Sequence, residues 1–126
     1  MNVVLVGIGG ALGSIARHGV GVAIARATPA SVTPYATMTV NLAGCLVIGV
    51  LAGLVASHRL AIGSGTRAFV FVGILGGFTT FSTFGLDTFT LAHAGRPGAA
   101  AANVAIQVVA GLALLAVGYA LTTRVQ

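Results

Sequence analysis

Hydrophobic residues dominate the chain in four long stretches that short polar connections separate. The stretches cover residues 3–25, 35–56, 68–92 and 99–121, and the connections carry proline, glycine, histidine or arginine. Each stretch is close to or above the roughly 20 apolar residues that a helix needs to cross hydrocarbon ~30 Å thick. The pattern predicts an all-α integral membrane protein whose four transmembrane helices form a single domain over residues 1–126.

The composition supports this class and excludes others. Hydrophobic residues make up 57% of the 126 residues and charged residues only 6%, whereas soluble domains carry about 25% charged residues. The basic residues are all arginines, scattered near the ends of the predicted helices. We therefore expect them to anchor the chain in the lipid bilayer and not to bind nucleic acid. Because the chain has 1 acidic residue, it cannot assemble a nucleophile, base and orienting acid, and we do not expect an enzyme.

The arginines are divided almost evenly between the two sides of the membrane. With four spans, both termini lie on one side. Leaving out Arg17 inside the first span, the side of the termini has Arg59, Arg67 and Arg124, and the other has Arg26 and Arg96. Such a weak bias permits insertion in both orientations, as an antiparallel dual-topology homodimer needs, although chance gives the same distribution. A chain of 126 residues is also small for building a pore alone, which favours an oligomer.

Glycines recur at the four-residue spacing that lets membrane helices approach each other closely. Such pairs would serve either association between chains or packing within one chain. The pairs are Gly9 and Gly13, Gly49 and Gly53, and Gly73 and Gly77.

The third stretch contains an unusual polar run. Residues 76–84 place two glycines, four hydroxyl side chains and three aromatic rings inside an otherwise apolar, membrane-length segment. Lipid offers no hydrogen-bond partner, so such a run is tolerated only where it is buried in protein or lines a watery cavity. We expect the third helix to be broken mid-membrane at residues 76–80, as in transporters that hold ions at such breaks.

Two phenylalanines follow this predicted break. Phe81 and Phe84 share a helix face, and Ser82 and Thr83 flank it. Phenylalanines in membrane helices usually only face lipid or pack, but a ring has a positive edge that attracts an anion without trapping it. The backbone carbonyls of residues 76–79, freed by a break, would instead suit a small monovalent cation.

Further polar residues inside the spans each allow two interpretations. Asn41 would either join two helices by a hydrogen bond or donate to an anion. Asn103 and Gln107 lie one turn apart and would either hold helices together or continue a polar track. Arg17 would snorkel to the interface or draw anions toward an entry. Asp87, the acidic residue, would pair with an arginine or lie in a water-filled vestibule.

Four motifs together resemble the Fluc/CrcB family of fluoride channels. Residues 9–17 resemble the family's GGxxGAxxR signature, and residues 37–44 resemble its GTLxVNxxG motif. Residues 73–84 are similar to GFxGGFTTFSTF in nearly complete form, and residues 103–111 fit the fourth-helix pattern of Asn, a polar residue, then Gly-Leu. The TTFSTF segment is highly specific, whereas the glycine motifs alone would mean little.

The resemblance implies passive export of fluoride across a bacterial-type plasma membrane, the inner membrane of the cell. It also implies an antiparallel dual-topology homodimer with two pores. The residues it assigns to the anion path are Phe81 and Phe84 as lining, Asn41 as a donor, and Ser82, Thr83 and Gln107 as a polar track. It further implies a structural sodium ion at the dimer interface, held by the backbone carbonyls of Gly76 and Thr79.

The chain departs from the family pattern in places. Thr37 and Ser14 replace Gly and Ala, Asp87 replaces the usual Glu, and Gln107 stands where Ser or Thr is frequent. Some relatives work as pairs of different subunits, so a sister subunit stays open. Two other functions also stay open: a small proton-coupled multidrug exchanger, which would need an acid in the first helix, and a non-transporting membrane scaffold.

Overall fold

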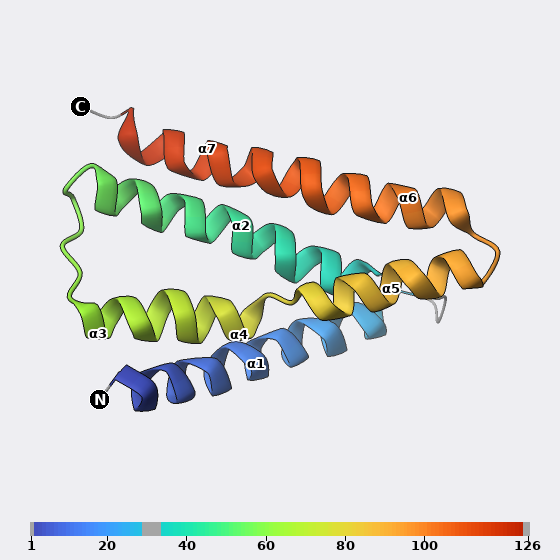
Figure 1. Cartoon of the computed structure of the whole chain (residues 1–126), viewed down its shortest axis with the longest axis horizontal. Helices are drawn as coiled ribbons and strands as arrows, with labels where there is room; N and C mark the ends of the chain where they lie inside the picture. Colours follow the sequence, from blue (N-terminus) through green and yellow to red (C-terminus); the bar gives the residue numbers. More distant parts are fainter. Residues whose placement is uncertain (1, 29–33, 125–126) are drawn as a thin grey trace.

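A computed structural model describes residues 2–28 and 34–124, and all the regular structure within them is helical. In this part of the chain, four helical segments are long and apolar enough to cross a membrane. They are Asn2–Ala27, Tyr35–Ala56, Ser64–His93 and Pro97–Thr123, arranged as an elongated bundle (Figure 1). The prediction of four membrane-spanning helices is therefore confirmed, and the protein is a multi-pass membrane protein.

Each of the last two segments consists of several helical pieces. The first two segments are the continuous helices α1 (Asn2–Ala27) and α2 (Tyr35–Ala56). The third comprises α3 (Ser64–Arg67), the π-helical η1 (Ala68–Leu75), α4 (Gly76–Phe78) and α5 (Phe81–His93). The fourth comprises α6 (Pro97–Ala105), the π-helical η2 (Ile106–Ala110) and α7 (Gly111–Thr123). π-helical turns are rare in proteins, and those that occur are often found at functional sites. The positions of η1 and η2 therefore indicate a functional site in the middle of the bundle.

Segments that follow one another in the chain run in opposite directions, so the closely packed pairs, α1 with the first half of the third segment and α2 with α7, run in the same direction. The start of α1, the α2–α3 connection and the end of α7 lie at one end of the bundle, and the α5–α6 connection lies at the other (Figure 1). That connection turns sharply at Gly95, whose φ of 72° suits a residue without a side chain. Pro97 then begins α6 at a first-turn position, where its missing N–H is not needed.

The third and fourth segments change partners along their length. The first half of the third segment, η1 and α4, packs against α1, whereas its second half, α5, packs against α6. In the fourth segment, α7 packs against α2. The residues between α4 and α5 therefore lie where the bundle passes from one set of helix pairs to another.

Glycines bring two of these helix pairs into backbone contact. A Cβ atom added to Gly77 would lie 2.5 Å from the Gly10 carbonyl oxygen, so the backbones of α1 and the third segment are in contact there. A Cβ added to Gly118 would lie 2.6 Å from the Leu46 carbonyl oxygen, so the backbones of α7 and α2 are in contact there. The glycine pairs found in the sequence lie at the same two helix interfaces, so they serve packing within the chain.

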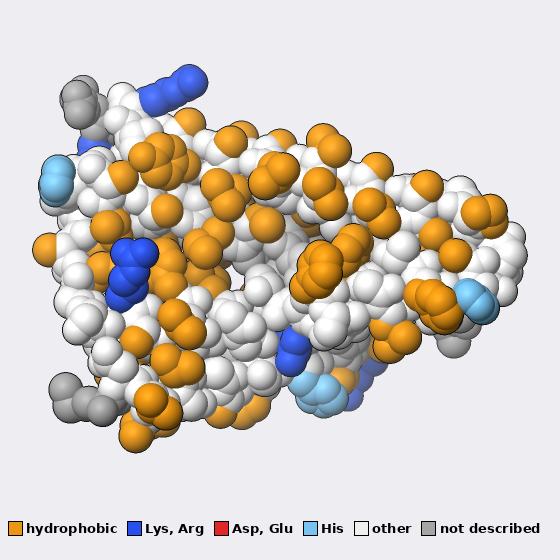
Figure 2. Space-filling view, in the orientation of Figure 1, with side chains coloured by type: hydrophobic (Ala, Val, Ile, Leu, Met, Phe, Trp, Pro, Cys, Tyr) orange, Lys and Arg blue, Asp and Glu red, His pale blue; other side chains and the backbone are white. Residues whose placement is uncertain are grey.

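Most large apolar side chains point outward. The buried apolar core of the described residues comprises Val40, Leu75, Leu91 and Ala100, and many other large apolar side chains are exposed. Figure 2 shows apolar side chains spread over the whole visible face, with few arginine and histidine side chains among them. Lipid or a protein partner covers such a surface, and packing of small residues, not a large apolar core, joins the helices.

We predict that Gly13→Ala destabilises the bundle. A Cβ at Gly13 would collide with the Ile74 carbonyl oxygen and lie 2.8 Å from the Phe78 nitrogen, so α1 would have to shift. The free energy of unfolding should fall by about 1–3 kcal/mol. Circular dichroism during titration of mixed micelles with sodium dodecyl sulfate measures this change. Gly19→Ala, on the same helix with nothing within 4 Å of the added Cβ, is the control; an equal effect of both variants would contradict the explanation.

Candidate functional site

The third segment is interrupted at two residues. Of residues 76–80, where the sequence predicts a break, Gly76–Phe78 are helical. Thr79 is extended, with φ −86° and ψ 160°, as is Thr80, with φ −153° and ψ 122°. The Thr79 N–H still donates to the Leu75 carbonyl at 3.0 Å. The Thr80 Oγ1 accepts the Thr83 N–H at 3.3 Å and caps the start of α5.

Asn41 of α2 supplies the acceptor that the Thr80 N–H lacks along its own segment, and also binds the Thr80 carbonyl, which as the N-cap carbonyl begins the bonding of α5. The Thr80 N–H donates to Asn41 Oδ1 at 2.9 Å, and Asn41 Nδ2 donates to the Thr80 carbonyl at 3.0 Å. A side-chain amide offers the same donor and acceptor as a peptide group, so its oxygen replaces the acceptor that the Thr80 N–H has lost and its nitrogen adds a second donor to the Thr80 carbonyl. This pair of hydrogen bonds holds the interruption against α2.

A chain of hydrogen bonds leads from Asn41 back to α5. Asn41 Nδ2 donates to Gln107 Oε1 at 2.7 Å, and Gln107 Nε2 donates to Asn103 Oδ1 at 2.8 Å. Asn103 Nδ2 then donates to Thr88 Oγ1 at 2.8 Å, and this hydroxyl donates to the Phe84 carbonyl at 2.8 Å. Asn103 is 2% exposed and Gln107 is 9% exposed. Four helical pieces, α2, η2, α6 and α5, are thus joined by neutral polar groups, of which Asn103 and Gln107 are buried and Asn41 and Thr88 half-buried.

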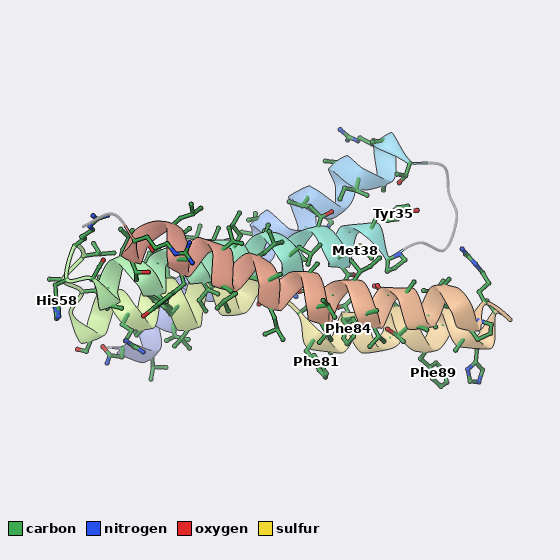
Figure 3. All side chains as sticks on the ribbon, turned by 90° about the horizontal axis from the view of Figure 1, so that it is seen from above. Tyr35, Met38, His58, Phe81, Phe84 and Phe89 are labelled. Atoms are coloured by element: carbon green, nitrogen blue, oxygen red, sulfur yellow. The ribbon has the colours of Figure 1, made fainter. Side chains whose placement is uncertain are left out.

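The two phenylalanines after the interruption lie side by side at the surface of the chain. Their ring centroids are 5.4 Å apart and their planes are tilted by 49°. Phe81 is 83% exposed and projects away from the other helices, whereas Phe84 is partly buried (Figure 3). The neighbouring hydroxyls of Ser82 and Thr83 are exposed and meet at Thr80 Oγ1, with oxygen–oxygen distances of 3.3 and 3.1 Å.

Two cavities meet at the interruption. The first, about 360 Å³, lies between α2 and the third segment, and Asn41, Gly76, Thr79, Thr80 and Phe81 are among its lining residues. Figure 2 shows a hollow near the middle of the visible face, where Figure 1 places α2 beside α4. The second, also about 360 Å³, lies between α1, α2 and the start of α5, where the C-terminal half of α1 leans away from the other helices (Figure 3). Thr80 lines both cavities.

The second cavity carries positive charge. The charge is that of Arg17 of α1, and the imidazole of His18 and the hydroxyls of Ser14 and Thr83 also line this cavity. Asp87 lies one turn beyond Thr83, and its Oδ2 is buried without a hydrogen-bond partner among the described residues. The structure therefore brings Arg17 to the interruption and leaves Asp87 farther along α5.

Sequence reasoning missed the central position of Thr80. This residue bonds to Asn41 through its backbone, caps α5 through its hydroxyl and lines both cavities. A threonine directly before a helix is a common capping residue, and this signal was available in the sequence. Thr88, which accepts from Asn103, was also missed because a lone threonine in a membrane helix carries no distinguishing pattern.

Oxygen atoms of the backbone are the groups here that could hold a metal ion. Within residues 2–28 and 34–124, no group of three or more His, Cys, Asp or Glu side chains could do so. An uninterrupted helix would direct the N–H of Thr80 to Gly76 and that of Thr83 to Thr79. These two N–H groups go instead to Asn41 Oδ1 and Thr80 Oγ1. The carbonyls of Gly76 and Thr79 are therefore released from their helical donors, and both residues line the first cavity.

The chain belongs to the CrcB family, because the model of that family, described as CrcB-like protein, Camphor Resistance (CrcB), matches residues 4–119. The family resemblance drawn from the motifs is thus confirmed. With its membrane-spanning helices, this membership identifies a multi-pass protein of the cell membrane.

Several relatives are similar over nearly their whole length. The chain is 46% identical to the fluoride-specific ion channel FluC of Methylobacillus flagellatus over 120 residues, 95% of this chain and 93% of the relative. It is 48% identical to FluC of Paracoccus denitrificans over 113 residues, 90% and 87% of the two chains. It is 45% identical to FluC of Rhodospirillum centenum over 119 residues, 94% and 93% of the two chains. These relatives are named as ion channels and not as enzymes.

We predict that Asn41→Leu destabilises the fold. The change leaves the N–H and carbonyl of Thr80 without their side-chain partner, so the free energy of unfolding should fall by about 1–3 kcal/mol. Unfolding by sodium dodecyl sulfate in mixed micelles measures this value. Thr39→Val, an exposed position on the same helix, serves as the control and should change it little. Equal stability of Asn41→Leu and the wild type would show that the bridge does not support the fold.

Proposed function

We propose that this protein is a fluoride-selective channel that lets fluoride leave the cytoplasm passively. The observation that carries the proposal is the polar interruption itself, bridged by Asn41 and followed by Phe81 and Phe84, in a chain whose relatives are named fluoride-specific ion channels. A scaffold would have no use for extended backbone and buried amides inside a membrane helix, because each unpaired group there costs several kcal/mol.

The proposed anion path uses neutral groups beside the interruption. Ring edges of Phe81 and Phe84 carry partial positive charge, and the hydroxyls of Ser82 and Thr83 can donate hydrogen bonds. Such groups replace the water shell of a small anion without the strong fixed charge that would retain it. Gln107 and Asn41 extend the polar groups into the bundle.

In the proposed path, positive charge lies in the cavity that leads to the neutral groups and not among the neutral groups themselves. Arg17 lines the second cavity, which opens beside the hydroxyl of Thr83. A cation in a cavity with low-dielectric walls raises the local concentration of anions and speeds their entry. In this scheme the second cavity is the vestibule through which fluoride reaches the neutral path.

The proposed assembly is an antiparallel dimer whose two copies form two pores. Phe81 is 83% exposed in the single chain, and the first cavity is open beside it. A large aromatic ring next to released carbonyls suits a protein partner better than lipid, because lipid offers the carbonyls no donor. A second copy inserted in the opposite orientation would cover this face and place the interruption at mid-membrane depth in both copies.

A structural sodium ion fits the same face. The carbonyls of Gly76 and Thr79 line the first cavity and are released from their usual helical donors. Carbonyl oxygens are hard ligands suited to a small alkali cation, and two from each copy would make four around one ion. A bound cation would supply positive charge between the two paths and join the two copies.

Export needs no pump on physical grounds. Hydrogen fluoride is a weak acid that crosses a bilayer uncharged and ionises in a less acidic cytoplasm. A membrane potential negative inside then drives the anion outward with about 2.3 kcal/mol per 100 mV. Selectivity against chloride is essential, since a chloride leak would collapse this potential.

We predict rapid fluoride release from liposomes that contain this purified chain alone. A fluoride electrode measures the release, and a chloride electrode on matched liposomes should record none. Absence of fluoride release from well-inserted protein would contradict a self-sufficient channel. If addition of a homologous subunit then restored release, the assembly would be a pair of different subunits; if not, the proposed function is wrong.

The same assay tests the aromatic path. Phe81→Ile and Phe84→Ile should each lower fluoride release about tenfold, because a branched aliphatic side chain has no positive edge to face the anion. Phe89→Ile is the matched control, an exposed phenylalanine on the same helix that lies beyond the paired rings. An equal loss in all three variants would point to general damage of α5 instead of a path along Phe81 and Phe84.

We predict that sodium supports assembly. Purification and reconstitution in N-methyl-D-glucamine should lower the dimer fraction, measured by single-molecule photobleaching in liposomes, and lower fluoride release severalfold. Added sodium should restore both, and potassium, which is larger, should restore them less. A dimer fraction and a release rate that do not change without sodium would refute a structural role of this ion.

A further inference from the structure

Both amide hydrogens of Asn41 are already engaged within the chain. Asn41 Nδ2 donates to the Thr80 carbonyl at 3.0 Å and to Gln107 Oε1 at 2.7 Å. An amide nitrogen carries two hydrogens, so it has no third hydrogen to offer. A fluoride ion that accepts from Asn41 must therefore first replace one of these two oxygen atoms.

The two oxygen atoms are not equally easy to replace. The Thr80 carbonyl belongs to backbone that Asn41 also holds from the other side, through its Oδ1 and the Thr80 N–H at 2.9 Å. Gln107 Oε1 belongs to a long side chain with several rotatable bonds, and a rotation of that side chain leaves the backbone in place. The shorter of the two bonds thus goes to the more movable acceptor.

Gln107 keeps a second attachment when its oxygen moves. Its Nε2 donates to Asn103 Oδ1 at 2.8 Å, and Asn103 is 2% exposed and in turn donates to Thr88 Oγ1. The amide of Gln107 can therefore turn about this bond without leaving the polar chain. The chain ends at the carbonyl of Phe84, one of the two residues of the proposed aromatic path.

We propose that Gln107 Oε1 substitutes for the anion at Asn41 and is displaced by fluoride as it passes. This inference rests on the proposed channel function and adds to it a residue that controls how fluoride binds to Asn41. In the empty path the oxygen satisfies a donor that would be costly to leave unpaired in a membrane. In the occupied path it competes with the anion, so that fluoride binds weakly enough to leave. Gln107 is thus a positioning residue that sets how strongly Asn41 holds fluoride.

Two variants of Gln107 remove the competing oxygen in different ways. Gln107→Ser is too short to reach Asn41, and Gln107→Met keeps the length of the side chain but has only a weak acceptor. At fluoride concentrations well below saturation, both should raise release from liposomes about threefold to tenfold, the worth of one neutral hydrogen bond. Val109→Met is the matched control, because Val109 lies on the same η2 segment and is 67% exposed.

The outcomes separate the possible roles of Gln107. Unchanged or slower release in both variants would mean that Gln107 only joins helices, and the proposal fails. Wild-type release with Gln107→Met but altered release with Gln107→Ser would mean that only side-chain volume matters, and the proposal also fails. No release from the wild type itself would refute the channel function, which is a separate result.

A second measurement uses the wild-type protein, so its result does not depend on the stability of a variant. In wild-type protein labelled with ¹⁵N-glutamine in micelles, fluoride titration should shift the side-chain amide resonance of Gln107, because its oxygen loses the Asn41 donor. Chloride at the same concentration should leave this resonance in place. A resonance that stays in place while the same protein releases fluoride from liposomes would overturn the proposal.

Discussion

The structure depends on the pair of hydrogen bonds between the side-chain amide of Asn41 and the backbone of Thr80. Inside a membrane, two extended residues in a helix would leave backbone groups unpaired, at several kcal/mol each. One asparagine on a neighbouring helix removes this cost for the Thr80 N–H, which has no acceptor in its own segment. The interruption can then persist, release the carbonyls of Gly76 and Thr79, and set the direction in which α5 departs.

The same place is where the bundle changes its helix pairs. Before the interruption the third segment is held against α1 by glycine contacts, and after it α5 packs against α6. The fourth segment passes from α6 to α7 through η2, which carries Gln107 at this level. Two segments that change partners at one level cannot fill the space between them with apolar side chains alone. Buried amides fill it, and two cavities open on either side of Thr80.

Neutral groups suit a path that must both accept and release an ion. A fixed charge would bind fluoride tightly and hold it, whereas amides, hydroxyls and ring edges supply partial charges that exchange quickly with one another. The arginine nearest to these groups, Arg17, lines the second cavity. Its amides are already hydrogen-bonded to each other, so in the proposed path an anion would have to compete for them.

The class, the four membrane helices and the family could all be predicted from the amino-acid sequence, because crossing hydrocarbon demands a local run of apolar residues and the motifs are local too. It also marked residues 76–84 as polar. That Thr79 and Thr80 leave the helix, and not the glycines, could be seen only in the folded chain. The reason is distance along the chain: Asn41 lies 39 residues from Thr80 and 66 from Gln107, so only folding brings these partners together.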